Sequence, residues 1–270
     1  MPFDRCRALG VPLTVVPSTG STNADLLADV ERTDHLAVLA TLDQTAGRGR
    51  LDRVWVAPPG RTLAASVLVR SLLTPQARGW LPLAAGAAMR EAVVAILPSA
   101  PEGPTSVVPS AVGESDVTVK WPNDVLVGGR KVCGILAQVA SDGSVVVGAG
   151  VNLTLSADEL PTPVATSLVL AGASGDADAL ADAVLAVFWA RFREAVAGLV
   201  AGGPAAEAVR SGVRTACGTI GRRVRVELPG GVVVERTATS VDDDGRLVVT
   251  DEFGEDTAIA VGDVTHLRYA

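Results

Sequence analysis

Arginine and glycine alternate in the segment Gln44–Arg53, which reads Q-T-A-G-R-G-R-L-D-R, and this pattern is typical of a loop that binds an anion. Gly47 and Gly49 free the backbone to approach a ligand, and guanidinium groups donate paired hydrogen bonds to carboxylates and phosphates. Three arginines against one aspartate (3 − 1) give residues 48–53 a charge of +2, within a chain of net charge −7. A solvated turn between strands would have the same composition, so other segments must decide between the two interpretations.

Three further segments place polar side chains where a helix or strand begins or ends. Ser21–Asn23 precede an apolar pattern of helical spacing, so they could cap that helix or line a pocket at its start. Lys120 ends an alternating stretch, on the side opposite to its neighbours, and Trp-Pro-Asn-Asp follows it. In Gly148–Asn152 two glycines would let a ligand approach the backbone closely, although a bulge or tight packing would look the same.

Hydrophobic periodicity predicts the elements that must hold these segments. Strands are expected over 13–16, 36–42, 62–69, 131–139 and 144–152, and one that begins at 117 and stops at Pro122; helices are expected over 24–30, 81–97, 176–200 and 205–213. Gly128-Gly129 is expected to form a hairpin turn, and Pro98–Asp116 a surface loop or insertion. After Gly218, short strands over 224–228, 232–235, 237–241, 247–250 and 257–260 predict a small β-barrel.

The composition indicates a soluble globular protein and argues against several classes of function. The chain has 270 residues, 48% of them hydrophobic and 20% charged, and it lacks the run of about 18 apolar residues that a membrane helix needs. Its acidic balance argues against a nucleic-acid partner, whose binding depends on neutralised phosphates. The N-terminus shows no signal-peptide core, and the three cysteines have no zinc or redox spacing, so a cytoplasmic protein with reduced thiols is predicted.

Histidine is scarce, which limits the catalytic mechanisms that the chain could use. His35 and His266 are the only two, neither lies in a motif, and each is predicted to be a surface or packing residue. A Ser-His-Asp or Cys-His mechanism therefore has little to build on, and H-E-x-x-H, C-x-x-C and G-x-S-x-G motifs are absent. If the protein is an enzyme, positioning and electrostatics are expected to supply the catalysis.

Five motifs together resemble the biotin protein ligases and occur in the order of that family. They are S-T-N at 21–23, Q-T-A-G-R-G-R at 44–50 with Trp55, K-W-P-N-D at 120–124, K-V-C-G-I-L at 131–136 and G-A-G-V-N at 148–152. The resemblance covers roughly residues 13–170 and implies an α+β fold. A mixed, mostly antiparallel sheet with flanking helices, like that of class II aminoacyl-tRNA synthetases, would form a catalytic domain of residues 1–215. An SH3-like β-barrel domain would follow at 216–270.

The resemblance also implies which residues bind the substrates. It assigns biotin to Ser21, Thr22, Asn23, Gln44, Arg48, Gly49, Arg50 and Lys120. It assigns ATP and the adenylate to Arg48, Arg50, Trp55, Lys120, Asn123, Lys131 and Asn152, with Trp55 covering the adenine. Lys120 and Arg48 are the implied catalytic residues. The metal ligands stay open: Mg²⁺ would enter with the ATP phosphates, near Asp124.

The implied reaction has two steps and involves a protein partner. Biotin and MgATP form biotinyl-5′-AMP and pyrophosphate, and the biotinyl group then passes to one lysine of a biotin carboxyl carrier protein. The first step needs no general base, because the nucleophile is already a carboxylate, and this agrees with the scarcity of histidine. Cationic side chains and Mg²⁺ would offset the repulsion between carboxylate and phosphate, and a closing loop would protect the mixed anhydride from water.

Other kinds of protein share parts of this pattern, and the chain departs from the family in places. A lipoate–protein ligase shares the implied fold, a non-catalytic biotin-responsive regulator would bind without turnover, and a structural protein would leave the motifs unexplained. Ser21 follows only 20 residues, too few for the operator-binding domain of some relatives, so no repressor function is predicted. A monomer or weak homodimer is expected. Residues 51–54 are less basic and less rich in glycine than the family pattern, and Cys133 replaces a small apolar residue.

Overall fold

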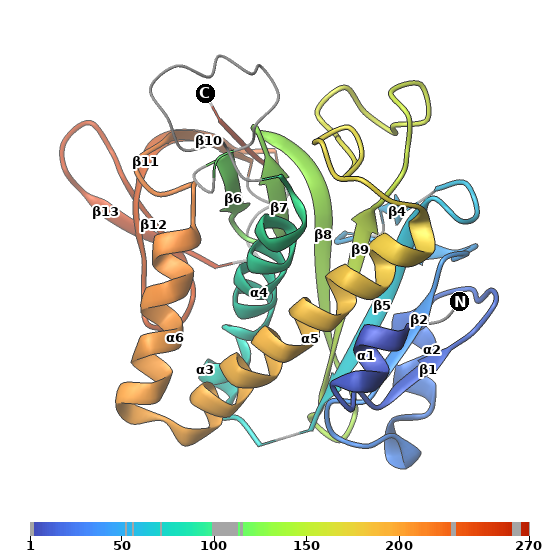
Figure 1. Cartoon of the computed structure of the whole chain (residues 1–270). Helices are drawn as coiled ribbons and strands as arrows, with labels where there is room; N and C mark the ends of the chain where they lie inside the picture. Colours follow the sequence, from blue (N-terminus) through green and yellow to red (C-terminus); the bar gives the residue numbers. More distant parts are fainter. Residues whose placement is uncertain are drawn as a thin grey trace.

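The computed structural model describes residues 3–51, 53–55, 57–70, 72–98, 113, 116–227, 231–260 and 266–269. Within these ranges the chain forms a large sheet packed against helices and a smaller sheet at its C-terminal end (Figure 1). Nearly all of the predicted insertion Pro98–Asp116 lies outside the described residues, as does Asp52 of the arginine-glycine segment.

A seven-stranded mixed sheet forms the frame of the larger part. Its order is β1 (Leu13–Val15), β2 (Val38–Thr41), β5 (Thr62–Val69), β9 (Val145–Asn152), β8 (Arg130–Val139), β7 (Asp124–Val127) and β6 (Val117–Lys120). Only β1 and β2 pair in parallel, and the other neighbours are antiparallel. A short hairpin of β3 (Gly47–Arg48) and β4 (Val54–Trp55) stands apart from this sheet. The predicted mostly antiparallel sheet with flanking helices is therefore confirmed.

Helices cover both faces of the sheet, which explains why β5 is apolar along its whole length. Val67 faces the main core, which includes residues of α1 (Asp4–Ala8), α4 (Leu81–Ile96) and α5 (Ala177–Ala201). Its neighbour Leu68 points to the other face because side chains alternate along a strand. There it packs in a small cluster with Leu26 of α2 (Thr22–Ala28) and Val30 of the 3₁₀ turn Val30–Arg32. All eight residues of β5 are buried.

The helix α4 is apolar because it is a core helix. One helical stretch among the described residues, Pro75–Ile96, is long and apolar enough by composition to cross a membrane, with a mean hydropathy of 1.2. This stretch joins α3 (Pro75–Arg78) to α4, and 56% of its apolar 18-residue window is buried inside the protein. Leu81 and Met89 are almost completely buried, in the same core as the sheet and α5. Packing within the protein therefore accounts for its hydropathy.

The smaller sheet is antiparallel throughout and has the order β13-β12-β11-β10-β14. Its strands are β10 (Arg223–Glu227), β11 (Val233–Val241), β12 (Leu247–Thr250), β13 (Asp256–Ile259) and β14 (His266–Tyr269). The prediction of two strands over 232–235 and 237–241 was wrong, because β11 runs through both and accommodates a register shift between Ala238 and Ser240. The strand β14 was not predicted.

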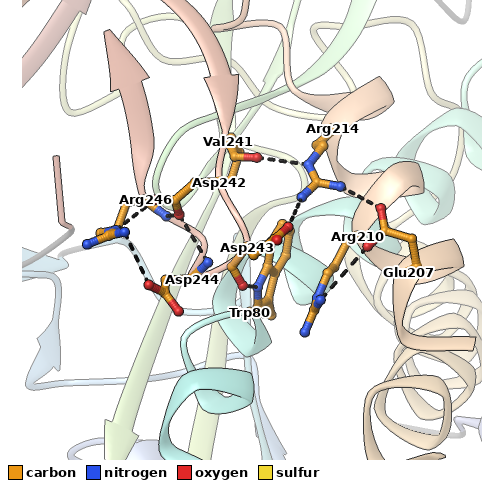
Figure 2. A network of polar contacts seen from close by, with 9 residues as sticks. All are labelled: Trp80, Glu207, Arg210, Arg214, Val241, Asp242, Asp243, Asp244 and Arg246. Atoms are coloured by element: carbon orange, nitrogen blue, oxygen red, sulfur yellow. Dashed lines mark hydrogen bonds and ion pairs between the residues drawn. The ribbon is translucent and has the colours of Figure 1, made fainter. Parts of the chain in front are cut away.

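A polar network attaches the smaller sheet to α6 (Gly203–Ala216) and to Trp80, which precedes α4 (Figure 2). The Trp80 indole Nε1 donates a hydrogen bond of 2.7 Å to the carbonyl of Asp243 in the turn between β11 and β12. Arg214 pairs with both Asp243 and Glu207, at 2.9 and 2.7 Å, and its guanidinium lies 5.4 Å from the Trp80 ring. Because the Trp80 side chain is fully buried, this contact fixes the two parts of the chain against each other.

A second indole reaches the same turn from the K-W-P-N-D motif. Trp121 Nε1 donates to the carbonyl of Gly245 at 3.1 Å, and the Trp121 amide donates to Thr219 Oγ1 at 3.0 Å. Gly245 has a φ of 78°, which favours glycine, and a Cβ there would lie 3.3 Å from Leu83. The smaller sheet therefore borders the strand end that carries Lys120.

The three cysteines are buried and free, as the spacing predicted. Burial raises the pKa of the Cys6 thiol to about 12, with the hydrogen bond to Asp182 as the next cause. Burial also raises the pKa values of Cys133 and Cys217. These thiols are therefore protonated at neutral pH and serve as small core residues.

His35 should make the fold less stable in mildly acidic solution. Its Nδ1 accepts a hydrogen bond of 3.1 Å from the amide of Arg70, which requires that this nitrogen is unprotonated. Burial lowers the pKa of His35 below 6.5, and the positive charge of Arg70 adds to the shift. A lowered folded-state pKa means that the unfolded chain binds the proton more tightly, so stability is present above pH 6.5 and is lost as the pH falls through the folded-state pKa.

Urea unfolding at a series of pH values between 7.5 and 5.0 measures this effect. His35→Gln keeps a polar side chain that does not titrate, and it should show a smaller loss of stability than wild type over that range. Equal pH dependence in both proteins would contradict the prediction.

Candidate active site

A cavity of about 290 Å³ opens on the face of the sheet that α2 covers. It is lined by most of the residues that the motifs predicted, namely Ser21, Thr22, Asn23, Gln44, Arg48, Gly49, Arg50, Trp55, Asn123, Asp124, Lys131 and Asn152. Lys120 is the one predicted site residue that does not line it. The five motifs are thus brought together from a helix start, a hairpin and four strands of the sheet.

Two rows of paired residues on β5, β9 and β8 form the floor of this cavity, and all of them except Leu136 are small. Ser66, Gly148 and Leu136 are paired across β5, β9 and β8. These three residues are the first row. The second row, two residues further along each strand, consists of Ala64, Gly150 and Gly134, and its two glycines are called the glycine floor below. Because paired residues project to the same face of a sheet, these two rows leave space above the strands where larger side chains would fill it.

A hydrogen-bonded network of uncharged side chains covers the first row. Asn23 Nδ2 donates to Gln138 Oε1 at 2.8 Å and to the carbonyl of Leu136 at 3.2 Å. Ser66 Oγ lies 2.6 Å from Asn23 Oδ1 and 2.7 Å from Thr22 Oγ1. The side chains of Thr22, Asn23 and Ser66 are buried. Their positions are therefore set before any ligand enters.

The network also includes Gln44, and it explains the polar triplet at the start of α2. The Thr22 amide donates to Gln44 Oε1 at 3.0 Å, and Thr22 Oγ1 lies 3.2 Å from the same oxygen. Ser21 caps the helix, since its Oγ accepts from the amide of Ala24 at 3.4 Å. Both interpretations of Ser21–Asn23 therefore hold: the first residue caps the helix, and all three line the cavity.

The hairpin β3–β4 carries the arginine-glycine segment over the second row. A Cβ at Gly47 would overlap Gln44 Nε2 and lie 2.7 Å from the carbonyl oxygen of Trp55, so this position requires glycine. The Gly49 amide donates to the carbonyl of Arg53 at 2.6 Å and closes the turn. Leu51 at the tip has a φ of 54°, a conformation that branched or bulky side chains seldom adopt.

The indole of Trp55 lies against the glycines of the second row. A Cβ at Gly150 would be 2.9 Å from Trp55 Cε2, and one at Gly134 would be 3.3 Å from Trp55 Cζ3. Among the described residues, Trp55 Nε1 has no hydrogen-bond partner, although the atom is buried. A buried donor without a partner is unfavourable, so Trp55 presents an unsatisfied N–H group inside the cavity.

The end of the cavity below the hairpin is cationic. Arg48, Arg50, Arg53 and Lys131 line it together with a single carboxylate among the described residues, that of Asp124, for a net charge of +3. Lys131 Nζ pairs with Asp124 Oδ1 at 2.6 Å. Burial lowers the pKa of Arg50, and the neighbouring Arg53 adds to the effect. This end is therefore suited to a ligand with several negative charges.

Two asparagines brace the cavity walls through their side-chain amides. Asn123 Nδ2 donates to the carbonyl of Ile135 at 3.1 Å, which ties the K-W-P-N-D motif to β8. Asn152 is buried, and its Nδ2 donates to the carbonyl of Thr166 at 2.8 Å. That bond holds the segment 161–166 beside β8, where Thr162 and Ala165 line the cavity.

Lys120 lies in the same transverse row as the glycine floor, at the edge of the sheet. It pairs with Asp124, which pairs with Gly134 of the second row. The predicted alternation is confirmed, because Val119 and Trp121 are buried on the other side. Lys120 Nζ lies 5.3 Å from the centre of the Tyr269 ring rather than in the cavity. Burial lowers the pKa of Lys120, with Asp124 opposing the shift.

Several residues around the cavity were not predicted from the sequence. Ser66 joins the buried network, and its only signal was a polar residue in the centre of an apolar strand. Arg53 and the segment 161–165 also line the cavity. No group of three or more His, Cys, Asp or Glu side chains that could hold a metal ion occurs in the part of the chain that the structure describes.

Two family models match the chain. The Biotin/lipoate A/B protein ligase family matches residues 14–154, and the Biotin protein ligase C terminal domain matches residues 219–267. The chain is 41% identical over 260 residues to the biotin–[acetyl-CoA-carboxylase] ligase of Mycobacterium tuberculosis, covering 95% of this chain and 89% of the relative. It is 30% identical over 188 residues to the bifunctional ligase/repressor BirA of Bacillus spizizenii, covering 67% of this chain and 52% of that relative.

Solved structures show the same fold. The biotin protein ligase of Aquifex aeolicus, in complex with biotin and ATP, superposes with a TM-score of 0.73 at 24% identity, covering 96% of this chain and 99% of that one. The biotin protein ligase of Leishmania major, in complex with biotin, gives a TM-score of 0.62 at 22% identity, covering 93% and 98%. Because a family model matches more than half of its length and a relative is 41% identical, the chain belongs to the biotin/lipoate A/B protein ligase family.

Proposed function

We propose that this protein is a biotin–protein ligase, which activates biotin with ATP and transfers it to a lysine of a biotin carboxyl carrier protein. The observation that carries the proposal is the division of one cavity into two chemically different ends. One end has a buried network of neutral donors and acceptors, and the other has three arginines and a lysine against one carboxylate.

The neutral end suits the ureido ring of biotin. A cyclic urea presents one carbonyl acceptor and two N–H donors, and the ring needs fixed partners of both kinds. Ser21, Thr22, Asn23 and Gln44 offer hydroxyl and amide groups that neighbouring side chains already hold in place. The apolar side chains of Ala64 and Leu136 line the same cavity and suit the sulfur-containing ring and the valeryl chain.

The cationic end suits the first chemical step. A carboxylate oxygen of biotin attacks the α-phosphorus of ATP, the new C–O–P bond forms, and the bond to the β-phosphate breaks, so pyrophosphate leaves. Arg48, Arg50 and Lys120 would offset the repulsion between the two anions and stabilise the charge that builds on the phosphorus oxygens. Trp55, the glycine floor and Asn152 would hold the adenine, with Lys131 and Asn123 bordering the phosphates.

In the second step the carrier lysine attacks the acyl carbon of biotinyl-5′-AMP. An amide bond forms, the bond between the acyl carbon and the phosphate oxygen breaks, AMP leaves, and the amine loses a proton. The enzyme must keep water from the same carbon, because a mixed anhydride hydrolyses. The hairpin β3–β4, which lies over the second row of the floor, is placed to do this.

Magnesium would enter with ATP rather than at a site built by the protein alone. Mg²⁺ commonly binds through one or two carboxylates together with substrate phosphates and water. Asp124 is the carboxylate that fits this pattern, because it lines the cavity beside Lys131. The ion would neutralise part of the negative charge on the phosphates, and Asp124 and Lys131 would orient them.

A lipoate–protein ligase is the alternative substrate class within the same family. The C-terminal domain model is that of biotin protein ligases, and the relative at 41% identity is named for biotin and acetyl-CoA carboxylase. Both observations favour biotin. The decisive experiment incubates the protein with MgATP, a carrier domain and either biotin or lipoate, and then measures the intact mass of the carrier. We expect a biotinyl adduct; a lipoyl adduct alone, or no adduct, would refute the proposal.

The same proposal extends to the partners, the location, the oligomeric state and the domains of the enzyme. The carrier is the biotin domain of an acyl-CoA carboxylase, and nucleic acid and membrane are not partners. We further propose a cytoplasmic enzyme that works as a monomer or weak homodimer. Its catalytic domain would be 1–215 and its C-terminal domain 216–270.

The hairpin segment Gly47–Arg53 should become more ordered when the adenylate binds. Its glycines permit motion, and only Gly47 is buried in this segment, among the residues described. Hydrogen exchange of this segment should slow several-fold when biotinyl-5′-AMP is added, because the arginines lie over its carboxyl and phosphate oxygens. Strand β5 serves as the internal control, since it is buried in both states. Equal protection with and without ligands would contradict the prediction.

A further inference from the structure

The only tyrosine of the chain, Tyr269, contacts the lysine of the K-W-P-N-D motif. Tyr269 lies on β14 of the smaller sheet, and its ring centre is 5.3 Å from Lys120 Nζ and 4.8 Å from Arg222 Cζ. A cation within about 6 Å of a ring centre is attracted to the negative face of that ring. The C-terminal part of the chain therefore supplies the group that holds the Lys120 ammonium.

The Tyr269 hydroxyl also connects to the backbone next to Lys120. It lies 3.3 Å from Thr219 Oγ1, and this oxygen accepts the hydrogen bond from the Trp121 amide at 3.0 Å. Trp121 is anchored again through its indole, which donates to Gly245 of the smaller sheet. Side chain and backbone at the end of β6 are therefore both held by the C-terminal part of the chain.

Without Tyr269, the obvious partner for Lys120 is Asp124. The two residues are paired directly across β6 and β7, and opposite charges at paired positions attract each other. In the structure Asp124 pairs instead with Lys131, at 2.6 Å. Burial lowers the pKa of Lys120, and the charge of Asp124 opposes only part of this shift, so the buried ammonium gains from the further contact with the Tyr269 ring. The two lysines thus have different nearest partners: the Tyr269 ring for Lys120 and the Asp124 carboxylate for Lys131.

We propose that Tyr269 is a positioning residue for Lys120: it holds the ammonium at the sheet edge, away from Asp124 and ready to move to the phosphates. This inference rests on the proposed adenylation reaction. When the ring is lost, Lys120 collapses onto Asp124, competes with Lys131 and is no longer available to the transition state. The rate of adenylation then falls, while the neutral end of the cavity is unaffected.

Steady-state pyrophosphate exchange on the full chain tests the proposal. Tyr269→Leu should lower kcat about ten-fold and leave KM for biotin unchanged, because the lost contact acts on the transition state. Tyr269→Phe keeps the ring and should restore most of the rate. Phe253→Leu removes an exposed aromatic side chain from the turn between β12 and β13 and should behave as wild type. A wild-type kcat in Tyr269→Leu, or equal losses in the Leu and Phe variants, would overturn the proposal.

A direct probe separates this positioning role from a general loss of folding. Because the chain has one tyrosine, 3-fluorotyrosine labelling gives one ¹⁹F signal. The signal should shift when biotin and a non-hydrolysable ATP analogue are added to the wild-type sequence and should stay fixed in Lys120→Met. An equal shift in both proteins would overturn the proposal. If unlabelled wild-type protein fails to biotinylate a carrier, it is the proposed function that fails instead.

Discussion

Replacing Lys120 with alanine should lower the rate of biotin-dependent pyrophosphate exchange by about 100-fold or more, as removal of one preorganised donor to a transition-state anion does in other enzymes. Lys120 projects to the cavity face at the end of the row that contains Asp124, Gly134 and Gly150. Its backbone is two strand spacings, about 10 Å, from Gly134 of the glycine floor. An extended lysine side chain can span most of that distance. Lys131, the only other lysine, is committed to Asp124.

The fold should tolerate this change. Lys120 is half-buried at the edge of the sheet, and burial disfavours its charged form. Replacing it therefore removes the free-energy cost of burying a charge as well as the contact with the Tyr269 ring. The midpoint of urea unfolding should therefore stay close to that of wild type. Arg225→Ala, which removes an exposed cation from β10, is the matched control and should keep full activity. Exchange at the wild-type rate in Lys120→Ala would rule out the proposed role.

The pH dependence of the reaction gives an independent check on Lys120. Because burial lowers its pKa from the ordinary value of 10.5, the ammonium should lose its proton at a lower pH than a solvated lysine. The exchange rate should then decline on the alkaline side, and Lys120→Arg should move that decline to higher pH, since arginine stays protonated. An alkaline limb that is the same in both proteins would assign it to another group.

Elements with a strong local signal could be predicted from the sequence. The strand 62–69 was predicted with its observed bounds, because eight apolar or small residues are bounded by polar segments and both faces are buried. The hairpin turn at Gly128 and Gly129 also follows from local chemistry, since both residues have a positive φ. At these places the residues that determine the structure are neighbours in the sequence.

Elements that depend on distant partners could not be predicted. The helix α1 has five residues, and its first amides are capped from α5: Arg5 and Cys6 donate to the carboxylate of Asp182 at 2.9 and 3.0 Å. A carboxylate 176 residues away leaves no local pattern. Likewise β14 is stabilised by pairing with β10, and the bulge in β11 depends on its pairing with β12. In each case tertiary contacts, rather than the local propensity of the sequence, determine the element.

The candidate site shows the same division between local and distant determinants. Asn152 was found because it follows two glycines at a strand end, whereas Gln44 was assigned through the resemblance to the biotin protein ligases; both line the cavity. Ser66 was missed, because its role arises from strand register, which places it beside Gly148 and under Asn23. The position of Lys120 beside Tyr269 also depends on how two sheets pack, and no spacing within the motif reveals it.

Gly148→Ala should raise KM for biotin about 100-fold and leave KM for ATP nearly unchanged, since two or three hydrogen bonds would be lost at one end of the cavity only. A Cβ at Gly148 would overlap Asn23 Oδ1 and lie 2.9 Å from Asn23 Cγ. Asn23 would have to leave its position, giving up its bonds to Gln138 and Leu136 and its contact with Ser66. Gly212→Ala in α6 is the matched control, because its added Cβ meets nothing within 4 Å.

A double-mutant cycle shows whether Asn23 is the cause. If the added methyl group acts by displacing Asn23, then Asn23→Ala alone should raise KM for biotin by a similar factor. Adding Gly148→Ala to that variant should then cost little more, because the smaller side chain leaves room for the new Cβ. The prediction would be contradicted if the two substitutions together raised KM by the product of their separate factors, or if Gly148→Ala alone kept the wild-type KM. Non-additive effects would instead identify the buried network of Thr22, Asn23 and Ser66 as the part of the cavity that selects the substrate.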